Sequence, residues 1–372
     1  MSERPRDAAT LIPTVFGRVV HAEVHSTEVA LLRPLGGARE STSTRSVRVL
    51  LVRGNDGQFG VGEASSVDWL DGGATKADVD RALAQVAQRI GEQSPNAGSL
   101  LRGTLDPALP GAVRSALQTA LLDMQARRRG QTLAALLGAT APCSPLAVSA
   151  LIGSGSLEDM ASEAAGYAAL GLASFKIKVG GRDLADDRRS VLAVREAIGV
   201  QAKLRLDANR AWDQVQATRG LVELAVSGAE FLEEPLRAGE DSALPPSSLR
   251  VALDESIRNA DDLTVALARG GFQVLVLKLE RVGGPIPALA LAQTAMRNGL
   301  EVVFTDSIES AVGRAATVHV AAAAAQRGGR QPSAVGLGGL FLLRDGSEPC
   351  ATVEVRGPGL GLAESVFLGD AA

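Results

Sequence analysis

Two hydrophobic patterns divide the chain, and the first of them is a strand pattern. Residues 14–25 and 46–53 are rich in β-branched side chains, which favour strands. The second run is followed by an Asn-Asp-Gly turn at 55–57 and by the short apolar run FGVGEA. Such turns between strand patterns are typical of hairpins, so we expect an antiparallel hairpin here.

Helical patterns follow these strands. Apolar residues recur at helical spacing over 76–93 and 109–137, and Gly138 supplies a stop signal after the second stretch. Strands followed by helices without alternation predict an α+β domain over residues 1–140. The final segment, 340–372, contains CATVEV and GPGLGL, and we expect it to return and pack on this domain.

The second hydrophobic pattern occupies residues 141–339, where short apolar runs alternate with amphipathic stretches such as 183–198 and 214–227. Eight such runs with helices between them are typical of a parallel β/α barrel, which is an α/β fold. In chain order the runs are PLAVSALIG, SFKIKV, KLRLDAN, EFLEEP, RVALDES, VLVLKLE, EVVFTDS and AVGLGG.

Most of these runs end at a polar residue, and the polar residues are evenly spaced. In chain order, these polar residues are Lys178, Asp207, Glu233, Asp254, Lys278 and Ser307. Successive residues of this set are 29, 26, 21, 24 and 29 positions apart, which is roughly the length of one strand, one helix and two loops. The carboxyl ends of parallel strands meet at one end of a barrel, where barrel enzymes hold their active sites. We therefore predict that these six side chains lie together.

Three of the six residues, Asp207, Glu233 and Asp254, are carboxylates on successive strands. An all-oxygen ligand set favours Mg²⁺, with Mn²⁺ as a substitute, and disfavours zinc. Each of Glu233 and Asp254 has an acidic neighbour, Glu234 and Glu255 respectively. Adjacent side chains on a strand point in opposite directions, so only one of each pair can face the barrel axis.

Lysines flank the acidic strands. Lys176 and Lys178 are two residues apart, so both side chains point to the same face of one strand. A lysine acts as a general base when burial and neighbouring positive charge favour its neutral form. With Lys278 on the opposite side, lysines would reach both faces of one carbon, remove a proton beside a carboxylate and leave an enediolate stabilised by Mg²⁺. The alternative is a pair of lysines that extend into solvent at a strand end.

The amino-acid composition limits which binding partners and which cellular compartment are expected for the protein. With 38 Lys and Arg against 42 Asp and Glu, the net charge of −4 argues against a nucleic-acid binder. Two cysteines, Cys143 and Cys350, fit a reducing cytoplasm rather than a disulfide framework. Residues 1–10 lack the apolar core of an export signal, and the apolar run 315–325 is too short to span a bilayer. We predict a cytoplasmic protein with a small-molecule carboxylate substrate and no nucleic-acid or membrane partner.

The ordered set KIK, LRLDANRAW, FLEEP, ALDES, KLERVGG and SIESAVGR resembles the enolase superfamily, muconate-lactonizing subgroup. The resemblance covers nearly the whole chain, including VGEAS at 61–65 and GPGLG at 357–361. It implies a modified (β/α)7β TIM-like barrel, with seven helices, and an N-terminal α+β capping domain. It also implies a lysine base that works with Mg²⁺. A homo-oligomer is compatible with the sequence, which does not determine the oligomeric state.

Within that subgroup, the motifs look most like those of the o-succinylbenzoate synthases of menaquinone biosynthesis. The likeness implies a lyase that dehydrates 2-succinyl-6-hydroxy-2,4-cyclohexadiene-1-carboxylate to 2-succinylbenzoate. By position, Lys178 would take the proton and then help hydroxide leave, and Lys278 would stabilise the enediolate from the other face by a cation–π contact.

The same resemblance implies roles for the residues around these lysines. Asp207, Glu233 and Asp254 would bind Mg²⁺, and Lys176 would support the catalytic lysines. The residues expected to orient or meet the substrate are Arg205, Asn209, Ser307, Gly338 and Gly339.

An isomerase on the same scaffold is the alternative, either an N-acylamino acid racemase or a dipeptide epimerase with two-sided lysine chemistry. The Asp-x-Asp pattern that dipeptide epimerases use on the eighth strand is absent from 334–341, and the last strand reads GLGG where many members have an Asp after Gly-Leu. The cap loop expected at about 27–45, which supplies specificity in this family, matches no pattern that predicts its substrate.

Overall fold

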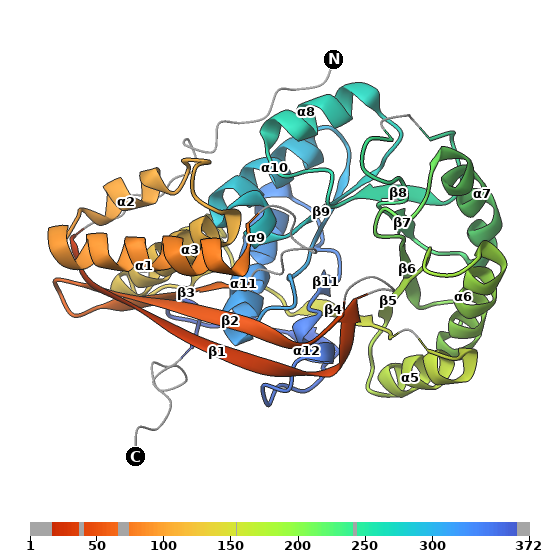
Figure 1. Ribbon diagram of the computed structural model, residues 1–372, viewed down its shortest axis with the longest axis horizontal. Coiled ribbons are helices and arrows are strands. Elements are labelled where there is room, and N and C mark those ends of the chain that lie inside the picture. The colour runs from red at the N-terminus through yellow and green to blue at the C-terminus, as the bar shows by residue number, and fades with distance from the viewer. Residues whose placement is uncertain (1–16, 37–40, 66–73, 154, 241–243, 363–372) are drawn as a thin grey trace.

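The computed structural model describes residues 17–36, 41–65, 74–153, 155–240 and 244–362. An antiparallel sheet with its helices forms one side of the molecule, and a curled parallel sheet with outer helices forms the other (Figure 1). The predicted fold class, a β/α barrel with an N-terminal α+β cap, is confirmed.

The cap sheet contains β1 (Val19–Gly36), β2 (Ser41–Gly54) and β3 (Phe59–Ala64), paired antiparallel in that order. The predicted hairpin at 55–57 is present, and Gly57 takes the positive φ of 80° that its turn requires. Residues 14–16 of the first predicted strand lie outside the described residues.

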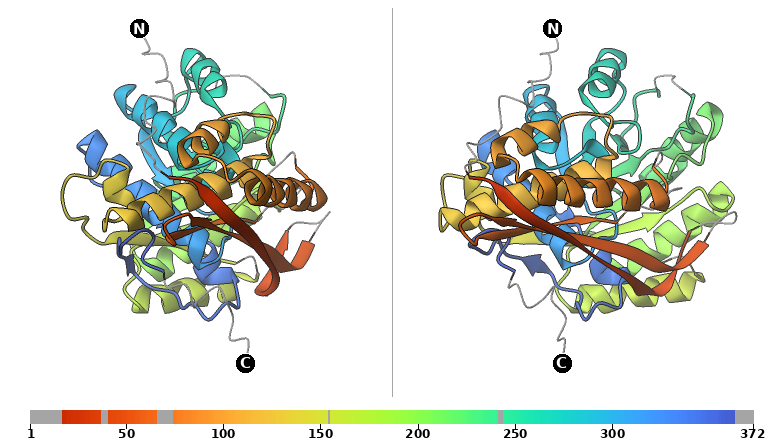
Figure 2. Two further views of the ribbon diagram at one scale, coloured as in Figure 1. Left: turned by 90° about the vertical axis from the view of Figure 1, so that its left-hand side faces the viewer. Right: turned by 60° about the vertical axis from the view of Figure 1, so that its left-hand side comes forward.

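The expected loop at 27–45 is strand in its described part. Residues 27–36 belong to β1 and 41–45 belong to β2, so the two strands form one long hairpin. Figure 2 shows this hairpin running along the molecule with the cap helices on one face. The prediction of a loop was wrong because the hydrophobic alternation needed for a strand is weak in a segment that is largely exposed.

Both helical stretches predicted in the cap are helical, but the second is divided into two helices. Helix α1 (Lys76–Gln93) has the predicted bounds, whereas the stretch 109–137 forms two helices, α3 (Gly111–Arg128) and α4 (Leu133–Leu136). Gly130, at φ 60°, interrupts the pattern between them. The short helix α2 (Ala97–Gly103), capped by the Asn96 side chain, was not predicted.

All eight predicted apolar runs contain strands of the curled sheet. The order is β10-β9-β8-β7-β6-β5-β4-β11, and a parallel bridge between Thr305 and Gly336 joins its two ends. The short β12 (Thr352–Val353) pairs antiparallel with β4. The eight strands are β4 (Leu146–Leu151), β5 (Ser174–Lys178), β6 (Lys203–Asp207), β7 (Phe231–Glu233), β8 (Arg250–Leu253), β9 (Val274–Leu277), β10 (Glu301–Phe304) and β11 (Val335–Gly336).

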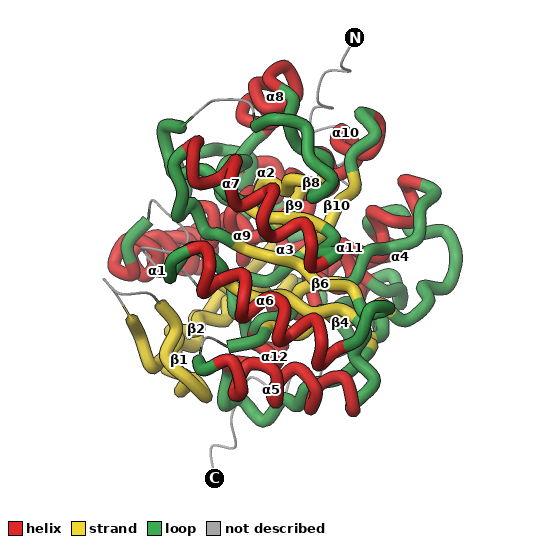
Figure 3. Tube along the Cα trace, turned by 90° about the vertical axis from the view of Figure 1, so that its right-hand side faces the viewer, coloured by secondary structure: helices red, strands yellow, loops and turns green. Residues whose placement is uncertain are grey.

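Helices cover the outside of this sheet, and Figure 3 shows α5, α6 and α7 side by side across it. The shortest strand-end interval, between β7 and β8, contains no helix in its described residues. The helices are α5 (Leu157–Ala169), α6 (Leu184–Ile198), α7 (Gln214–Leu224), the 3-10 turn η3 (Ala225–Ser227), α8 (Ala260–Arg269), α9 (Leu279–Val282), α10 (Pro285–Arg297), α11 (Ala311–Gly328) and α12 (Gly339–Leu342).

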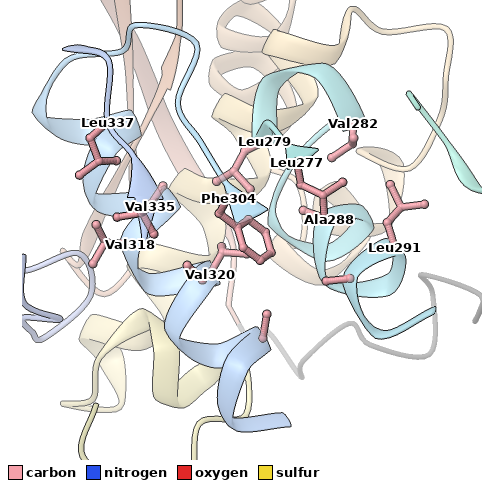
Figure 4. Close-up of a cluster of buried hydrophobic side chains, with 14 of the residues drawn as sticks. Leu277, Leu279, Val282, Ala288, Leu291, Phe304, Val318, Val320, Val335 and Leu337 are labelled. Carbon is pink, nitrogen blue, oxygen red and sulfur yellow. The ribbon is translucent and has the colours of Figure 1, made fainter. Parts of the chain in front are cut away.

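The core lies between the strands and these helices. Figure 4 shows one part of it, where side chains of β9 and β10 pack with those of α10 and α11. A separate buried cluster contains Phe231, Ala252, Val274, Val276 and Val303. Three of its members, Phe231, Val276 and Val303, also line the cavity described below, so the interior of the barrel is packed beneath the site.

Contacts between segments far apart in the sequence join the cap to the barrel. The carboxyl-terminal stretch contacts the cap, where Leu133 N–H donates to Gly359 O at 2.9 Å and Leu360 N–H donates to the Asp123 carboxylate at 2.7 Å. The segment 340–372 was predicted to return to the cap, and its last part, 363–372, lies outside the described residues. The β1–β2 hairpin reaches the barrel beside α12, where Arg344 N–H donates to Ala30 O at 2.9 Å (Figure 1). No helix in the described part of the chain has the length and apolarity needed to cross a membrane.

Candidate active site

A single cavity at the carboxyl ends of the barrel strands brings most of the predicted site residues together. The predicted residues that line it are Lys176, Lys178, Arg205, Asp207, Asn209, Glu233, Lys278, Ser307 and Gly338. Five residues that were not predicted also line this cavity: Ser149, Leu151, Thr305, Asp306 and Ile308. Asp254 contacts Lys278 directly, and Gly339 follows Gly338 at the start of α12.

Strand register places the acidic residues next to one another. Lys178 pairs with Asp207 across β5 and β6, and Asp207 pairs with Glu233 across β6 and β7. Glu233 lines the cavity, whereas the Glu234 carboxylate accepts hydrogen bonds from Asp254 N–H at 2.8 Å and Ser256 N–H at 2.7 Å. The strand pleat therefore separates the two neighbouring glutamates, as alternation requires.

Lys176 connects two of the carboxylates. Its Nζ lies 2.7 Å from Glu233 Oε1 and 2.8 Å from Asp207 Oδ2. Burial opposes a charged amine, yet the Asp207 and Glu233 carboxylates raise the pKa of Lys176 above its usual value. Lys176 is therefore an ammonium group held between two buried acids.

The third carboxylate has its own cations. Lys278 Nζ donates to Asp254 Oδ2 at 2.7 Å, and Arg281 forms an ion pair with Asp254 Oδ1. Although burial opposes ionisation, Arg281 and Lys278 hold the pKa of Asp254 well below its usual value. Sequence reasoning did not assign Arg281, but its position three residues after Lys278 in KLERVGG was the available signal.

Lys178 differs from the other two lysines. Burial lowers its pKa, and the positive charges of Lys176 and Lys278 add to the effect, while Asp207 opposes it. At Glu233, burial disfavours the charged carboxylate and raises the pKa to about 8, and repulsion from Asp207 and Asp254 adds to this rise. The site thus combines crowded carboxylates with a lysine whose neutral form is favoured.

The donor chemistry of the acids fits a hard divalent cation, because all three side chains supply oxygen and crowd one another in a buried site. Within the described ranges, no three His, Cys, Asp or Glu side chains are already arranged to hold a metal ion. Lys176, Lys278 and Arg281 contact the carboxylate oxygens instead. Metal binding at Asp207, Glu233 and Asp254 therefore stays a prediction, and it requires these cations to release the oxygens.

Arg205 and Asn209 have supporting contacts. Arg205 is 2% exposed, donates to Glu230 Oε2 at 3.0 Å and lies over the Phe231 ring at 5.3 Å. Asn209 N–H donates to Asp207 Oδ1 at 3.0 Å, and its side-chain amide donates to Glu255 Oε1 at 3.2 Å. Asn209 therefore contacts the Asp207 carboxylate directly, whereas Arg205 contacts residues at the beginning of β7.

Backbone strain accompanies these strand ends. Asn209, Arg210, Glu234 and Ile308 all have positive φ, between 41° and 62°. Residues other than glycine rarely adopt this conformation, and they do so mainly where the surrounding structure imposes it. The four positions follow β6, β7 and β10, and two of them, Asn209 and Ile308, line the cavity.

The glycines expected to meet the substrate donate to a carboxylate of the protein. Gly338 N–H donates to Asp306 Oδ1 at 2.7 Å, and Gly339 N–H donates to Asp306 Oδ2 at 3.0 Å. Burial raises the pKa of Asp306, while the amides of Gly339, Ile308 and Gly338 oppose the rise. The Ser307 hydroxyl is buried and has no hydrogen-bond partner among the described residues. Sequence reasoning missed Asp306, although it directly precedes Ser307 at a strand end.

Acids on three adjacent barrel strands, with lysines on the strands at either side, place groups suited to acid–base chemistry at one end of a barrel, which is where barrel enzymes hold their active sites. The chain belongs to the enolase superfamily. Residues 20–138 match the mandelate racemase / muconate lactonizing enzyme N-terminal domain, and residues 159–362 match the enolase C-terminal domain-like family.

Its relatives are enzymes. The chain is 29% identical to muconate cycloisomerase 1 of Pseudomonas putida over 293 residues, which cover 76% of this chain and 77% of the relative. It is 28% identical to the L-Ala-D/L-Glu epimerase of Clostridium acetobutylicum over 305 residues, covering 79% and 84%. The solved dipeptide epimerase of Methylococcus capsulatus, in complex with Mg and L-Arg-D-Lys, has a TM-score of 0.81 at 26% identity and covers 93% of this chain and 99% of that one.

Proposed function

We propose that the protein is a Mg²⁺-dependent racemase or epimerase that inverts the α-carbon of an N-acylated amino acid, a class that includes dipeptides. The observation that carries the proposal is the placement of Lys178 and Lys278. Their strands, β5 and β9, lie on either side of β6, β7 and β8. Asp207 and Glu233 end β6 and β7, and Asp254 directly follows β8. A carbon held between these lysines can lose a proton on one face and gain one on the other.

The acidic residues would hold the cofactor. Asp207, Glu233 and Asp254 are the proposed Mg²⁺ ligands, and Mn²⁺ is a chemically similar substitute. When bound, the cation would hold the substrate carboxylate and stabilise the negative charge that develops on it. The relative solved with Mg and a dipeptide supports this cofactor.

The lysines would perform the proton transfers. Neutral Lys178 takes the α-proton, so the C–H electron pair stays with the substrate, and the Lys278 ammonium returns a proton to the opposite face. The reverse substrate enantiomer exchanges these roles. Lys176 stays protonated beside Asp207 and Glu233 and disfavours a second positive charge on Lys178. The product has the composition of the substrate, and solvent restores the protonation state of each lysine.

Two other reactions are possible for this family. The dehydration by an o-succinylbenzoate synthase was predicted from the order of motifs, but the relatives compared above are cycloisomerases and epimerases and lend it no support of their own. A cycloisomerase would use one lysine to deliver a proton. The epimerase relatives and the lysines on both sides favour the two-sided reaction.

The test is proton exchange in D₂O with Mg²⁺ present. The D- and L-forms of N-acetylamino acids and dipeptides are incubated with the protein, followed by ¹H NMR of the α-proton and chiral chromatography. We expect both enantiomers to lose the α-proton signal and to interconvert, and we expect Lys278→Ala to abolish interconversion. Aromatisation of the cyclohexadiene substrate without any exchange in the N-acylamino acids would instead assign the synthase reaction.

A further inference from the structure

We propose that Asp306 makes the far end of the substrate cavity exclude anions, so that the N-acyl portion of the substrate is neutral or cationic. The far end is the wall formed by Ser149, Leu151, Asp306, Ser307, Ile308 and Gly338, and it is called the distal wall below. The inference rests on the proposed function, because it takes the reacting carboxylate to lie at the acidic strands. It adds a substrate class and a residue that selects it.

Strand order determines which part of the substrate meets the distal wall. The acids follow β6, β7 and β8, and the lysines follow β5 and β9 on either side. The remaining strands, β10, β11 and β4, complete the ring through the bridge between Thr305 and Gly336. A substrate bound by its carboxylate at β6–β8, with its α-carbon between the lysines, therefore extends its acyl group toward β10, β11 and β4.

Asp306 occupies the donors that an anionic acyl group would need. Asp306 is 4% exposed, and its carboxylate accepts hydrogen bonds from the N–H groups of Gly338 at 2.7 Å, Gly339 at 3.0 Å and Ile308 at 3.3 Å. Backbone N–H groups that converge on one carboxylate stabilise its negative charge, and they oppose the rise in pKa that burial causes at Asp306. A second carboxylate on the substrate would meet donors that are already used and a charge of the same sign.

The cations near this wall already have anionic or carbonyl partners. Arg314 donates to the Asp345 carboxylate at 2.9 Å, and Arg205 donates to the Glu230 carboxylate at 3.0 Å. Arg45, from the cap hairpin, donates to the Ser307 and Ile308 carbonyl groups. These arginines therefore offer little compensation to a second substrate anion.

The rest of the distal wall suits an amide or an ammonium group. The Ser307 hydroxyl is buried without a hydrogen-bond partner among the described residues, so it can donate to an amide oxygen or accept from an N–H group. Leu151 and Ile308 supply apolar surface beside it. This combination fits an N-acetyl or aminoacyl group, and it does not fit N-succinyl, muconate or other dicarboxylate substrates.

The experiment compares three derivatives of one amino acid that differ mainly in the charge of the acyl group: N-acetyl-leucine, glycyl-leucine and N-succinyl-leucine. Affinity is measured by calorimetry with saturating Mg²⁺, and kcat/KM is measured by chiral chromatography. We expect the neutral and cationic ligands to bind roughly tenfold more tightly than the anionic one. In Asp306→Asn, which removes the charge and nearly keeps the volume, the difference should fall below about threefold. Asp306→Ser is a second variant, and circular dichroism checks that both variants fold.

Glu223→Gln is the matched control, because it removes one carboxylate from the outer helix α7, where Glu223 pairs with Arg219. It should keep the wild-type preference. Equal or tighter binding of the succinyl ligand to the wild-type protein would overturn the inference, even if the variants fail to fold. Turnover of all three derivatives without a preference for acyl charge would support the proposed reaction and overturn the role of Asp306. Charge-selective binding without turnover would support the role of Asp306 and overturn the proposed reaction, and no binding of any ligand would overturn both.

Discussion

Lys176 and Lys178 lie two residues apart on β5 and both line the cavity, yet their surroundings differ. Lys176 contacts two carboxylates, which raise its pKa, whereas burial and the cations of Lys176 and Lys278 lower the pKa of Lys178. Sequence alternation predicted that both lysines face one side, but only packing could distinguish them, because proximity to each carboxylate depends on neighbouring strands.

The first prediction concerns the base. Lys178→Ala should lower turnover by about a hundredfold to ten-thousandfold, because the group that accepts the proton is lost, and it should leave Mg²⁺ affinity nearly unchanged. Kinetics and Mg²⁺ titration measure the two effects. Asp254→Asn is the contrasting variant and should weaken Mg²⁺ binding. The exposed lysine variant Lys203→Ala is the control, and near wild-type turnover in Lys178→Ala would exclude Lys178 as the base.

At the scale of elements, one side chain of the N-terminal sheet accepts hydrogen bonds from the first N–H groups of a barrel helix. Glu63 on β3 accepts hydrogen bonds from Ser310 N–H at 2.8 Å and Gly313 N–H at 3.0 Å, at the start of α11, and also from the Ser310 hydroxyl. The Ser310 side chain itself makes no capping hydrogen bond. A carboxylate at a helix N-terminus satisfies unpaired N–H groups and interacts favourably with the helix dipole. This contact joins the β3 strand to the loop that carries Ser307.

The second prediction tests this cap. Glu63→Gln should reduce the free energy of unfolding by about 1–3 kcal/mol, because a buried charged acceptor is replaced by an amide that satisfies fewer of these donors. Urea denaturation followed by circular dichroism measures the loss. Glu92→Gln, at an exposed position on α1, is the control and should cost about 0.5 kcal/mol or less. A Glu63→Gln protein as stable as the control would show that other groups cap α11.

Elements were predicted well where the pattern is local. The bounds of α1 and the eight strand runs follow from periodicity within each segment. The break between α3 and α4 and the hairpin at 27–45 were missed. Gly130 ends a helix only where the following chain turns, and the hairpin is held by contacts with distant segments, including Ala30 with Arg344.

At the scale of the whole molecule, His319 connects the barrel to the cap. It lies on α11, is 1% exposed, and accepts a hydrogen bond at Nδ1 from Ala134 N–H of α4 at 3.1 Å. Burial lowers the pKa of His319 to about 4 from its usual 6.5. These contacts give His319 a structural role at the junction of α11 and α4.

The third prediction is a pH dependence of stability. Because the folded pKa of His319 lies below the unfolded value, the unfolded chain binds a proton first as the pH falls. The stabilisation is therefore complete above about pH 6.5 and is lost as the pH decreases toward 4, by about 3 kcal/mol in total. Unfolding free energies measured across this range in wild type and His319→Gln should show a shallower slope in the variant.

His21→Asn is the matched control for this measurement, since His21 is exposed on β1. Its stability should follow the wild-type pH dependence. Identical slopes in wild type and His319→Gln would mean that other groups account for the acid sensitivity of the protein.

The sequence by itself determined the order of strands and helices and the identity of the polar strand ends, because period and spacing are local properties of the chain. It also predicted that Lys178, Asp207, Glu233 and Lys278 share one end of a barrel, since parallel strands of similar spacing end at the same level. These four side chains line one cavity.

Only the tertiary structure decided what surrounds those residues. Asp306 meets the Gly338 amide 32 positions away, and Arg45 reaches the Ser307 carbonyl from 262 positions away. Such contacts depend on how the cap and the two edges of the sheet pack, and no local period encodes them. For this reason the grouping of the polar strand ends could be predicted from the chain, whereas the contacts that Asp306 and Arg45 make around Ser307 and Gly338 emerged only from the fold.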